Sequence, residues 1–192
     1  VVLDEGDHML DLGFRDELEA ILEGCPESRR TWLFSATMPP EVLDLTRRFL
    51  SDPLRVSLVL DVACHEDISH RGCLVPTGRA REGLVNVLLA EQPPRALVFC
   101  RTREETSSTA AFLRDAGFGA SALHGDMTQR ERNDALESLR SGRSAVLVAT
   151  DVAARGLDVV GISHVIQVGL PGDLEAFVHR SGRTGRAGHA GC

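Results

Sequence analysis

Short apolar runs alternate with amphipathic segments along most of the chain, and this alternation constrains the fold more than any other feature. Residues 96–100 and 145–149 are apolar throughout, as expected for strands that are buried on both faces. The segments between such runs have helical periodicity over about 10–15 residues, which makes each strand–helix–strand stretch a βαβ unit. We therefore predict an α/β fold in which parallel sheets are flanked by helices.

The predicted elements form two series, separated where the apolar periodicity fades between Asp61 and Ser69. This places a first domain at 1–60, a linker at 61–69 and a second domain at 70–192. In the first domain we expect strands at 1–3, 31–34 and 54–60, and helices over 14–24 and 41–50. In the second we expect strands at 72–75, 96–100, 145–149 and 164–168, a short strand ending at Leu123, and helices over 79–90, 102–117 and 128–140.

All 21 basic residues are arginines, and the absence of lysine excludes a G-x-x-x-x-G-K-[ST] phosphate-binding loop from these residues. The formal net charge is −7, but the charge is unevenly distributed. Residues 1–69 contain 15 acids and 6 arginines, whereas residues 70–192 contain 13 acids and 15 arginines. This asymmetry is typical of a chain whose second part has a basic site for an anionic ligand, although uneven surface charge alone would also produce it.

The cysteine pattern and the apolar runs indicate the environment in which the chain works. Five cysteines are scattered without a C-x-x-C pair, which argues against a disulfide framework or a zinc site and favours a reducing, cytoplasmic location. No run approaches the ~18 apolar residues of a membrane span, and no signal-peptide pattern opens the chain. The chain begins at Val1, within an apolar run, so we expect it to be part of a longer protein.

Polar side chains follow the first two predicted strands. Asp4, Glu5 and Asp7 come directly after the first strand, and Ser35 and Thr37 come after the second. Parallel strands end at the same edge of a sheet, so the hydroxyl groups should lie beside the acids and could bond to Asp7. Acids at this place hold Mg²⁺ and position water in nucleoside triphosphatases, but a solvated strand end and a helix-capping turn remain alternatives.

Two segments of the second domain have residue types suited to phosphate. Residues 150–158 combine a hydroxyl group, small residues and a terminal carboxylate, which suit a phosphate and a ribose. Residues 179–186 space arginines three apart among glycine and small residues, a pattern that favours clamping a phosphate and stabilising charge during phosphoryl transfer. A solvent-exposed basic turn or a generic RNA-binding loop is the alternative for the second segment.

Taken together, the motifs resemble those of the DEAD-box ATP-dependent RNA helicases in order and spacing, over essentially the whole chain. The motifs are Asp4-Glu5-Gly6-Asp7, Ser35-Ala36-Thr37, Val98-Phe99-Cys100-Arg101-Thr102, His124-Gly125-Asp126 with Gln129-x-x-Arg132, residues 149–158, and residues 179–186. The resemblance implies two RecA-like domains facing each other across an ATP cleft, with RNA lying over both. Here the first domain would be partial and the second nearly complete, truncated at its end.

The resemblance also implies roles for single residues at the nucleotide. Asp4 would bind Mg²⁺ through water, and Glu5 would activate the hydrolytic water. Asp7 would contact Ser35, Thr37 and His179 and so couple hydrolysis to domain closure. The remaining nucleotide and coupling residues implied by the family are Arg183 and Arg186 as arginine fingers, Gly156 and Asp158 at the nucleotide with Asp158 on the ribose, and Arg180 beside His179 in coupling.

For RNA, the resemblance implies sequence-independent binding of phosphates by Arg101, Gly125, Arg132 and Thr150. Gly6 replaces the usual alanine of the family, and Gly169 stands where an acid is common. Without the phosphate-binding loop, the 192-residue chain by itself is predicted to be inactive. The parent protein is predicted to be an RNA-stimulated ATPase and helicase. The alternatives are a non-catalytic RNA-binding module and a DNA-directed translocase of the same superfamily.

Overall fold

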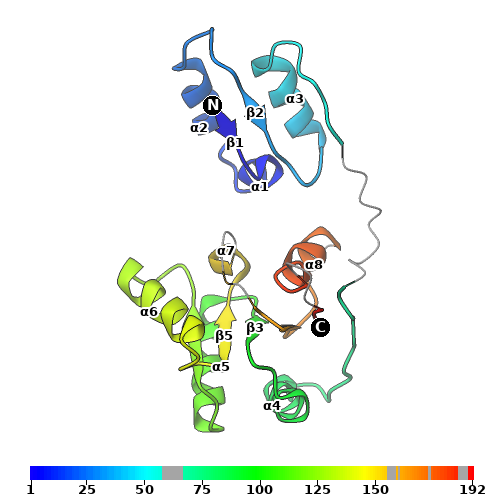
Figure 1. The fold of residues 1–192 in the computed structure, drawn as a ribbon, viewed down its shortest axis with the longest axis vertical. Helices are drawn as coiled ribbons and strands as arrows, with labels where there is room; N and C mark the ends of the chain where they lie inside the picture. Colours follow the sequence, from blue (N-terminus) through cyan, green and yellow to red (C-terminus); the bar gives the residue numbers. More distant parts are fainter. Residues whose placement is uncertain (58–66, 155–158, 160, 173, 186–189) are drawn as a thin grey trace. The chain divides into compact units, whose positions relative to one another are not determined.

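The computed structural model of the chain describes residues 1–57, 67–154, 159, 161–172, 174–185 and 190–192. It divides into two compact units, Val1–Leu60 (unit 1) and Asp61–Cys192 (unit 2). Within each unit the paired strands run parallel, and helices lie beside the sheet (Figure 1). The predicted α/β fold class is therefore confirmed.

Unit 1 is built on a two-stranded sheet with a small core. Strand β1 (Val2–Leu3) lies beside β2 (Trp32–Leu33), with Leu3 opposite Leu33. The accompanying helices are α1 (Gly6–Asp11), α2 (Arg15–Glu23) and α3 (Pro40–Phe49). The core consists of Leu3, Leu18, Leu22 and Leu45. Ile21 belongs to the apolar spacing that predicts α2, but its side chain is 59% exposed.

Unit 2 contains a four-stranded parallel sheet with the order β4-β5-β3-β6. Its strands are β3 (Ala96–Phe99), β4 (Ala120–Leu123), β5 (Val146–Ala149) and β6 (His164–Gln167). Its helices are α4 (Ala80–Glu91), α5 (Arg103–Asp115), α6 (Gln129–Arg140), α7 (Asp151–Ala154) and α8 (Leu174–Ser181). Parallel pairing requires each chain segment to cross over between strands, which is why helices separate them in sequence.

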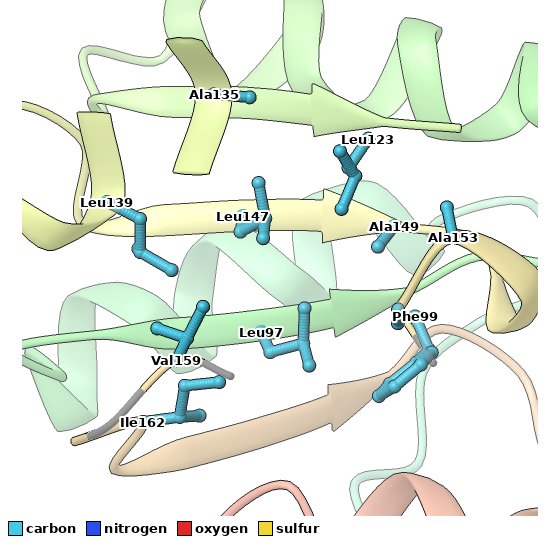
Figure 2. Close-up of a cluster of buried hydrophobic side chains, with 11 residues drawn as sticks. Leu97, Phe99, Leu123, Ala135, Leu139, Leu147, Ala149, Ala153, Val159 and Ile162 are labelled. Atoms are coloured by element: carbon cyan, nitrogen blue, oxygen red, sulfur yellow. The ribbon is translucent and has the colours of Figure 1, made fainter. Parts of the chain in front are cut away.

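Both faces of the unit 2 sheet are buried, and successive residues of β3 alternate between the two faces. Leu97 and Phe99 join the core that contains Leu139 of α6, which Figure 2 shows in close-up. Val98 joins the other core, which contains Leu113 of α5. Burial on both faces explains why the strands read as continuous apolar runs rather than alternating ones.

One predicted strand is not formed, and a second is not formed in its described part. Residues 72–75 form no strand, and Leu74 is fully exposed. Residues 54–57 of the strand predicted at 54–60 likewise lie outside any strand, with Leu54 90% exposed, and 58–60 lie outside the described residues. Apolar alternation predicts an extended chain, but a strand also needs a neighbour for its backbone groups, and in the described part of the chain neither segment has one.

Candidate functional site

A buried carboxylate organises the carboxyl edge of the unit 1 sheet. Asp7 is only 3% exposed. Its Oδ2 accepts hydrogen bonds from the backbone N–H and the hydroxyl of Thr37, at 2.7 and 2.8 Å. Its Oδ1 accepts one from the backbone N–H of His8 at 3.0 Å. Three donors therefore compensate the loss of water around this charge.

Ser35 completes this cluster through the backbone. The backbone N–H of Asp7 donates to the Ser35 hydroxyl at 3.0 Å, and that hydroxyl donates to the carbonyl of Thr37 at 2.7 Å. Ser35 and Thr37 follow β2, and Asp7 follows β1, so the parallel register of the two strands brings all three residues together. The contacts of Asp7 with Ser35 and Thr37 are therefore present as the sequence predicts.

The two acids before Asp7 differ from it in exposure. The carboxylates of Asp4 and Glu5 are both exposed, and Asp4 Oδ1 accepts the backbone N–H of Glu5 at 3.0 Å. Glu5 adopts the left-handed conformation, with φ of 52°, which is uncommon for a residue with a side chain. This sharp turn lets α1 begin directly after β1. Exposed carboxylate oxygens are suitable ligands for Mg²⁺, which keeps several waters when it binds protein.

Gly6, at the position where the family usually has alanine, lies close to the side chain of Leu33. Its backbone N–H donates to the carbonyl of Phe34 at 3.0 Å. A Cβ at this position would lie 3.1 Å from Leu33 Cδ1, so the neighbouring side chain would have to shift slightly to admit alanine. Glycine therefore allows the close approach of α1 to the strand β2.

In unit 2, the buried charge is a guanidinium. Arg180 on α8 is 5% exposed, and its Nε and Nη2 each donate to one carboxylate oxygen of Asp151 at 2.6 Å. Its Nη1 donates to Gln167 Oε1 at 3.3 Å and to the carbonyl of Gly169 at 3.5 Å. The guanidinium also lies 5.3 Å from the centre of the Phe99 ring. This bidentate geometry, with two parallel N–H···O bonds, is the strongest form of an arginine–carboxylate pair.

Asp151 is the partner that sequence reasoning missed. It lies two residues beyond the buried strand β5, after Thr150, and an acid at this edge of a parallel sheet was the available signal. Gly169 has a φ of 107°, a conformation that favours glycine over the acid that is common in the family. At this position the chain offers Arg180 a backbone carbonyl as a hydrogen-bond acceptor.

The other predicted residues of the 179–186 motif lie partly within the described structure. A shallow recess is lined by Phe99, Asp151, His179, Arg180 and Arg183, among others. His179 and Arg183 therefore lie at one place on unit 2. Arg186, Gly156 and Asp158 lie outside the described residues.

The residues predicted to bind RNA mostly follow the carboxyl ends of the unit 2 strands. Arg101 follows β3, Gly125 follows β4, and Thr150 follows β5, while the half-buried Arg132 lies in the first turns of α6. β5 pairs in register with both β3 and β4, so the three strand ends lie at one sheet edge. Arg103 adds a cation that the sequence analysis did not select, and its guanidinium would lie within 3.8 Å of a Cβ at Gly125.

The chemistry of this edge is ionic rather than thiol-based. Burial raises the pKa of the Cys100 thiol to about 11, so the group stays protonated near neutral pH and is no nucleophile.

The described residues contain no group of three or more His, Cys, Asp or Glu side chains arranged to hold a metal ion. No helix in the described part of the chain is both long and apolar enough to cross a membrane.

Comparisons with known proteins find helicase families that match parts of both units. Residues 79–188 match the helicase conserved C-terminal domain, and residues 1–45 match the DEAD/DEAH box helicase family. Over 191 residues the chain is 40% identical to the DEAD-box ATP-dependent RNA helicase RhpA of Helicobacter pylori and 46% identical to the ATP-dependent RNA helicase DeaD of Mycobacterium tuberculosis. These alignments cover 100% of this chain but 39% and 34% of the two relatives, so the chain spans little more than a third of either.

A solved structure extends the similarity to the fold. The chain matches the structure of Saccharomyces cerevisiae Dbp5 bound to RNA and ADP BeF3 with a TM-score of 0.84 and 28% sequence identity. The match covers 99% of this chain and 51% of that one. The similarity therefore includes both units.

Proposed function

Because this chain belongs to the DEAD-box helicase family, we propose that it forms part of an enzyme that couples ATP hydrolysis to local unwinding or remodelling of RNA. The observation that carries the proposal is the Asp7 cluster. The buried Asp7 binds Thr37 through its carboxylate and Ser35 through its backbone N–H, beside two exposed acids. A solvated strand end would not require a buried carboxylate with three donors. A helix-capping turn would leave the exposed acids without a role.

Asp4 and Glu5 are the residues that we assign to the nucleotide in unit 1. Bound Mg²⁺ would supply charge neutralisation on the transferring phosphate. The exposed carboxylate of Asp4 suits an ion that takes one or two protein carboxylates and is otherwise held through water and phosphate oxygens. The exposed carboxylate of Glu5 would orient the attacking water and accept its proton. Asp7 would hold Ser35 and Thr37 in a fixed position beside this pair.

Arg183 and Arg186 are the residues that we assign to charge stabilisation during hydrolysis. Guanidinium groups suit this role because they stay charged and bind phosphate oxygens in pairs. Arg180 would be structural, since its guanidinium is already occupied by Asp151. The contact of Asp7 with His179, the nucleotide contact of Gly156 and the ribose contact of Asp158 stay predictions.

We propose that RNA binds at the carboxyl edge of the unit 2 sheet through its phosphates. Arg101, Gly125 and Thr150 follow three neighbouring strands there, and Arg132 lies on the helix that follows β4. Cations and small residues along one edge can follow a phosphate backbone without reading bases. Binding should therefore weaken steeply with added salt and depend little on RNA sequence.

The test uses the complete gene product that contains this chain. We expect RNA to stimulate its ATP hydrolysis, and Glu5→Gln to lower kcat by about 10²–10⁴-fold, because a general base contributes on this scale. Asp11→Asn is the matched control, since this exposed acid lies at the far end of the short helix that Glu5 precedes, away from the cluster, and it should leave kcat unchanged.

Three outcomes separate the proposal from its alternatives. Equal stimulation by RNA and by DNA of the same sequence would favour a DNA-directed translocase. RNA binding without ATP hydrolysis would favour a non-catalytic RNA-binding module. A G-K-[ST] loop about 100 residues before Asp4 in the gene product would favour the enzyme. Because its residues contain no lysine, the 192-residue chain alone should not hydrolyse ATP, and hydrolysis above background would contradict this assignment.

We also propose a cytoplasmic location. Cys25, Cys73, Cys100 and Cys192 are free in the described structure, as is typical of proteins in a reducing compartment. Cell fractionation with an antibody against this chain would test the location.

A further inference from the structure

A five-residue segment at 67–71, here called the docking segment, lies against the last described residues of the chain. The backbone N–H of Ser69 donates to the carbonyl of Gly191 at 2.8 Å, and the N–H of Gly191 donates to the carbonyl of Asp67 at 2.8 Å. Ile68 thereby forms a parallel bridge with Gly191. The docking segment is thus fixed to unit 2 by backbone hydrogen bonds at its first half.

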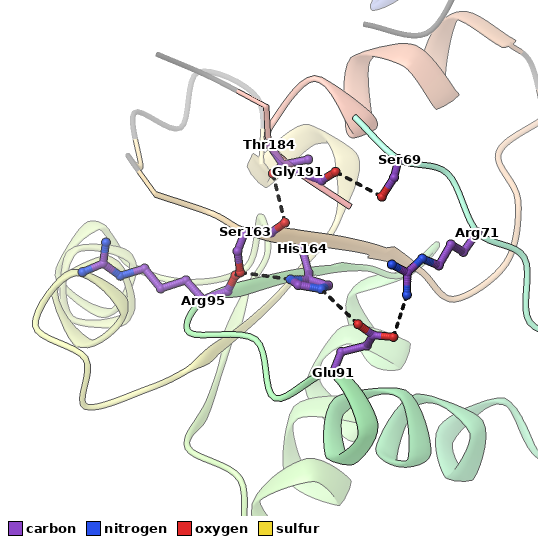
Figure 3. A network of polar contacts seen from close by, with 8 residues as sticks. All are labelled: Ser69, Arg71, Glu91, Arg95, Ser163, His164, Thr184 and Gly191. Atoms are coloured by element: carbon purple, nitrogen blue, oxygen red, sulfur yellow. Dashed lines mark hydrogen bonds and ion pairs between the residues drawn. The ribbon is translucent and has the colours of Figure 1, made fainter. Parts of the chain in front are cut away.

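Side chains fix the second half of the docking segment. Arg71 Nη1 lies 2.8 Å from Glu91 Oε1 at the end of α4, and Glu91 Oε2 lies 3.8 Å from His164 Nε2 on β6. Figure 3 shows these contacts converging on Glu91. The ring of His70 lies against that of Phe177 on α8, with ring centres 5.3 Å apart. The docking segment therefore contacts α4 and α8 directly, and it is linked to the edge of the sheet through Glu91.

Ile68 of the docking segment lies against Gly185, the last residue of the segment 182–185, here called the arginine loop. A Cβ at Gly185 would lie 2.6 Å from Ile68 Cγ1 and 3.1 Å from Ile68 Cδ1. Gly185 has a φ of 66°, so both its backbone conformation and the contact with Ile68 favour glycine there. Thr184 is buried and its hydroxyl donates to the carbonyl of Ile162 at 2.6 Å, so the other side of this turn is fixed to the body of unit 2.

We propose that Ile68 is a positioning residue, which holds the arginine loop in place by packing on Gly185. This inference rests on the proposed function, because there Arg183 stabilises the transferring phosphate. Arg183 is two residues from Gly185, and its backbone N–H donates to the carbonyl of Arg180 at 3.1 Å. The loop is therefore held at both ends, by the fixed Arg180 and by Ile68. Fixing the backbone in advance reduces the cost of placing the Arg183 guanidinium on its target.

The first experiment measures amide hydrogen exchange in the 192-residue chain and does not depend on activity. In Ile68→Ala, the backbone amides of residues 182–185 should exchange about tenfold faster, because local opening of the loop no longer has to break the Ile68 contact. Leu136→Ala is the matched control. This substitution also removes three side-chain carbons from a half-buried position. Leu136 lies on α6 and packs against the core that contains Leu97, so exchange of the arginine loop should be unchanged.

A second variant keeps this test decisive if Ile68→Ala does not fold. Ile68→Val removes one carbon and keeps the branched side chain, so it should fold and accelerate exchange of the loop by a smaller factor in the same direction. Wild-type exchange at residues 182–185 in whichever of the two variants folds would overturn the proposal.

The second experiment measures ATP hydrolysis by the complete gene product. Ile68→Ala should lower kcat about tenfold while KM for ATP changes less than about twofold, because a transition-state contact is lost and ground-state binding is kept. Leu136→Ala should change neither constant. An unchanged kcat in Ile68→Ala would overturn the positioning role. A wild-type protein without RNA-stimulated hydrolysis would instead overturn the proposed function, and the exchange result would still decide whether Ile68 fixes the loop.

Discussion

Among the residues that the structure describes, each unit buries one charged side chain, and the two are stabilised in different ways. Asp7 in unit 1 is surrounded by neutral donors, two of them backbone N–H groups. Arg180 in unit 2 faces an opposite charge, the carboxylate of Asp151. The comparison teaches that a carboxylate in the first turn of a helix can be satisfied largely by nearby backbone N–H groups. A guanidinium on a helix needs a partner brought from another element.

The surroundings of the two charges differ as well. Asp7 lies at the end of a two-stranded sheet with a single small core, and Arg180 lies beside a four-stranded sheet with a core on each face. We therefore expect loss of Asp7 to affect unit 1 locally. Loss of the Arg180 partner should affect the larger unit 2 more strongly.

The largest effect is expected from Asp151→Ala. It leaves the 5% exposed Arg180 buried without its counter-charge, and should lower the free energy of unfolding of unit 2 by about 3 kcal/mol. A urea titration followed by hydrogen exchange of unit 2 peptides measures this change. Asp126→Ala is the matched control, because its pair with Arg103 is about 60% exposed on both sides and should contribute less than about 1 kcal/mol. Equal losses in the two variants would contradict the distinction.

A smaller effect is expected from Asp7→Asn. Either orientation of the new amide directs its NH₂ group at a backbone donor, of His8 or of Thr37, so one buried donor loses its acceptor. The free energy of unfolding of unit 1 should fall by about 2 kcal/mol, measured by exchange of unit 1 peptides in urea. Asp11→Asn, on the exposed end of the same helix, should have no effect. A stable Asp7→Asn variant would show that the cluster is not what holds these loops.

The smallest effect is expected at helix α6, which has the side-chain cap that the helices of unit 1 lack. Thr128 and Glu131 form a reciprocal capping box, and Thr128→Ala should lower the stability of unit 2 by about 1 kcal/mol. Hydrogen bonds from the backbone and hydroxyl of Thr128 lower the pKa of Glu131 below its ordinary value of 4.5.

This pKa shift makes the effect of the cap depend on pH. Because the folded pKa is lowered, the contribution of Glu131 is present above the unfolded pKa and is lost as pH falls through the folded pKa. The stability difference between wild type and Thr128→Ala should therefore be larger at about pH 7 than at about pH 3. A difference that does not change between these two conditions would exclude the carboxylate from the cap.

The fold could be predicted from sequence where local pattern and burial agree. The runs that became β3 and β5 are apolar because both sheet faces are covered, and Thr128 begins a helix because its side chain can cap it. The same Thr-x-x-Glu pattern at Thr102–Glu105 forms only half of a capping box. Thr102 accepts the backbone N–H of Glu105, but the Glu105 carboxylate accepts the N–H of Arg101 instead of that of Thr102. The backbone N–H groups of Arg101 and Thr102 compete for the Glu105 carboxylate, and the spacing of Thr102 and Glu105 in the sequence does not predict which of them binds it.

The candidate site could be predicted where strand order implies proximity. Asp7, Ser35 and Thr37 follow adjacent parallel strands, so their contact follows from the sheet. The pairing of Asp151 with Arg180 could not be predicted in this way. The two residues are 29 positions apart, and Arg180 lies on a helix whose orientation depends on packing. The contact of Ile68 with Gly185 spans a still longer stretch of chain and joins two segments without any periodic pattern.

Strand β2 carries the only strongly fluorescent side chain of the protein. Trp32 is the single tryptophan, it is 63% exposed, its ring stacks on that of Phe34, and the chain contains no tyrosine. Intrinsic fluorescence excited at the red edge of absorption will therefore come from unit 1 alone, from the strand that leads directly to Ser35 and Thr37. Unit 2 contains neither tryptophan nor tyrosine and does not contribute to this emission. The emission therefore reports on the Asp7 edge of unit 1.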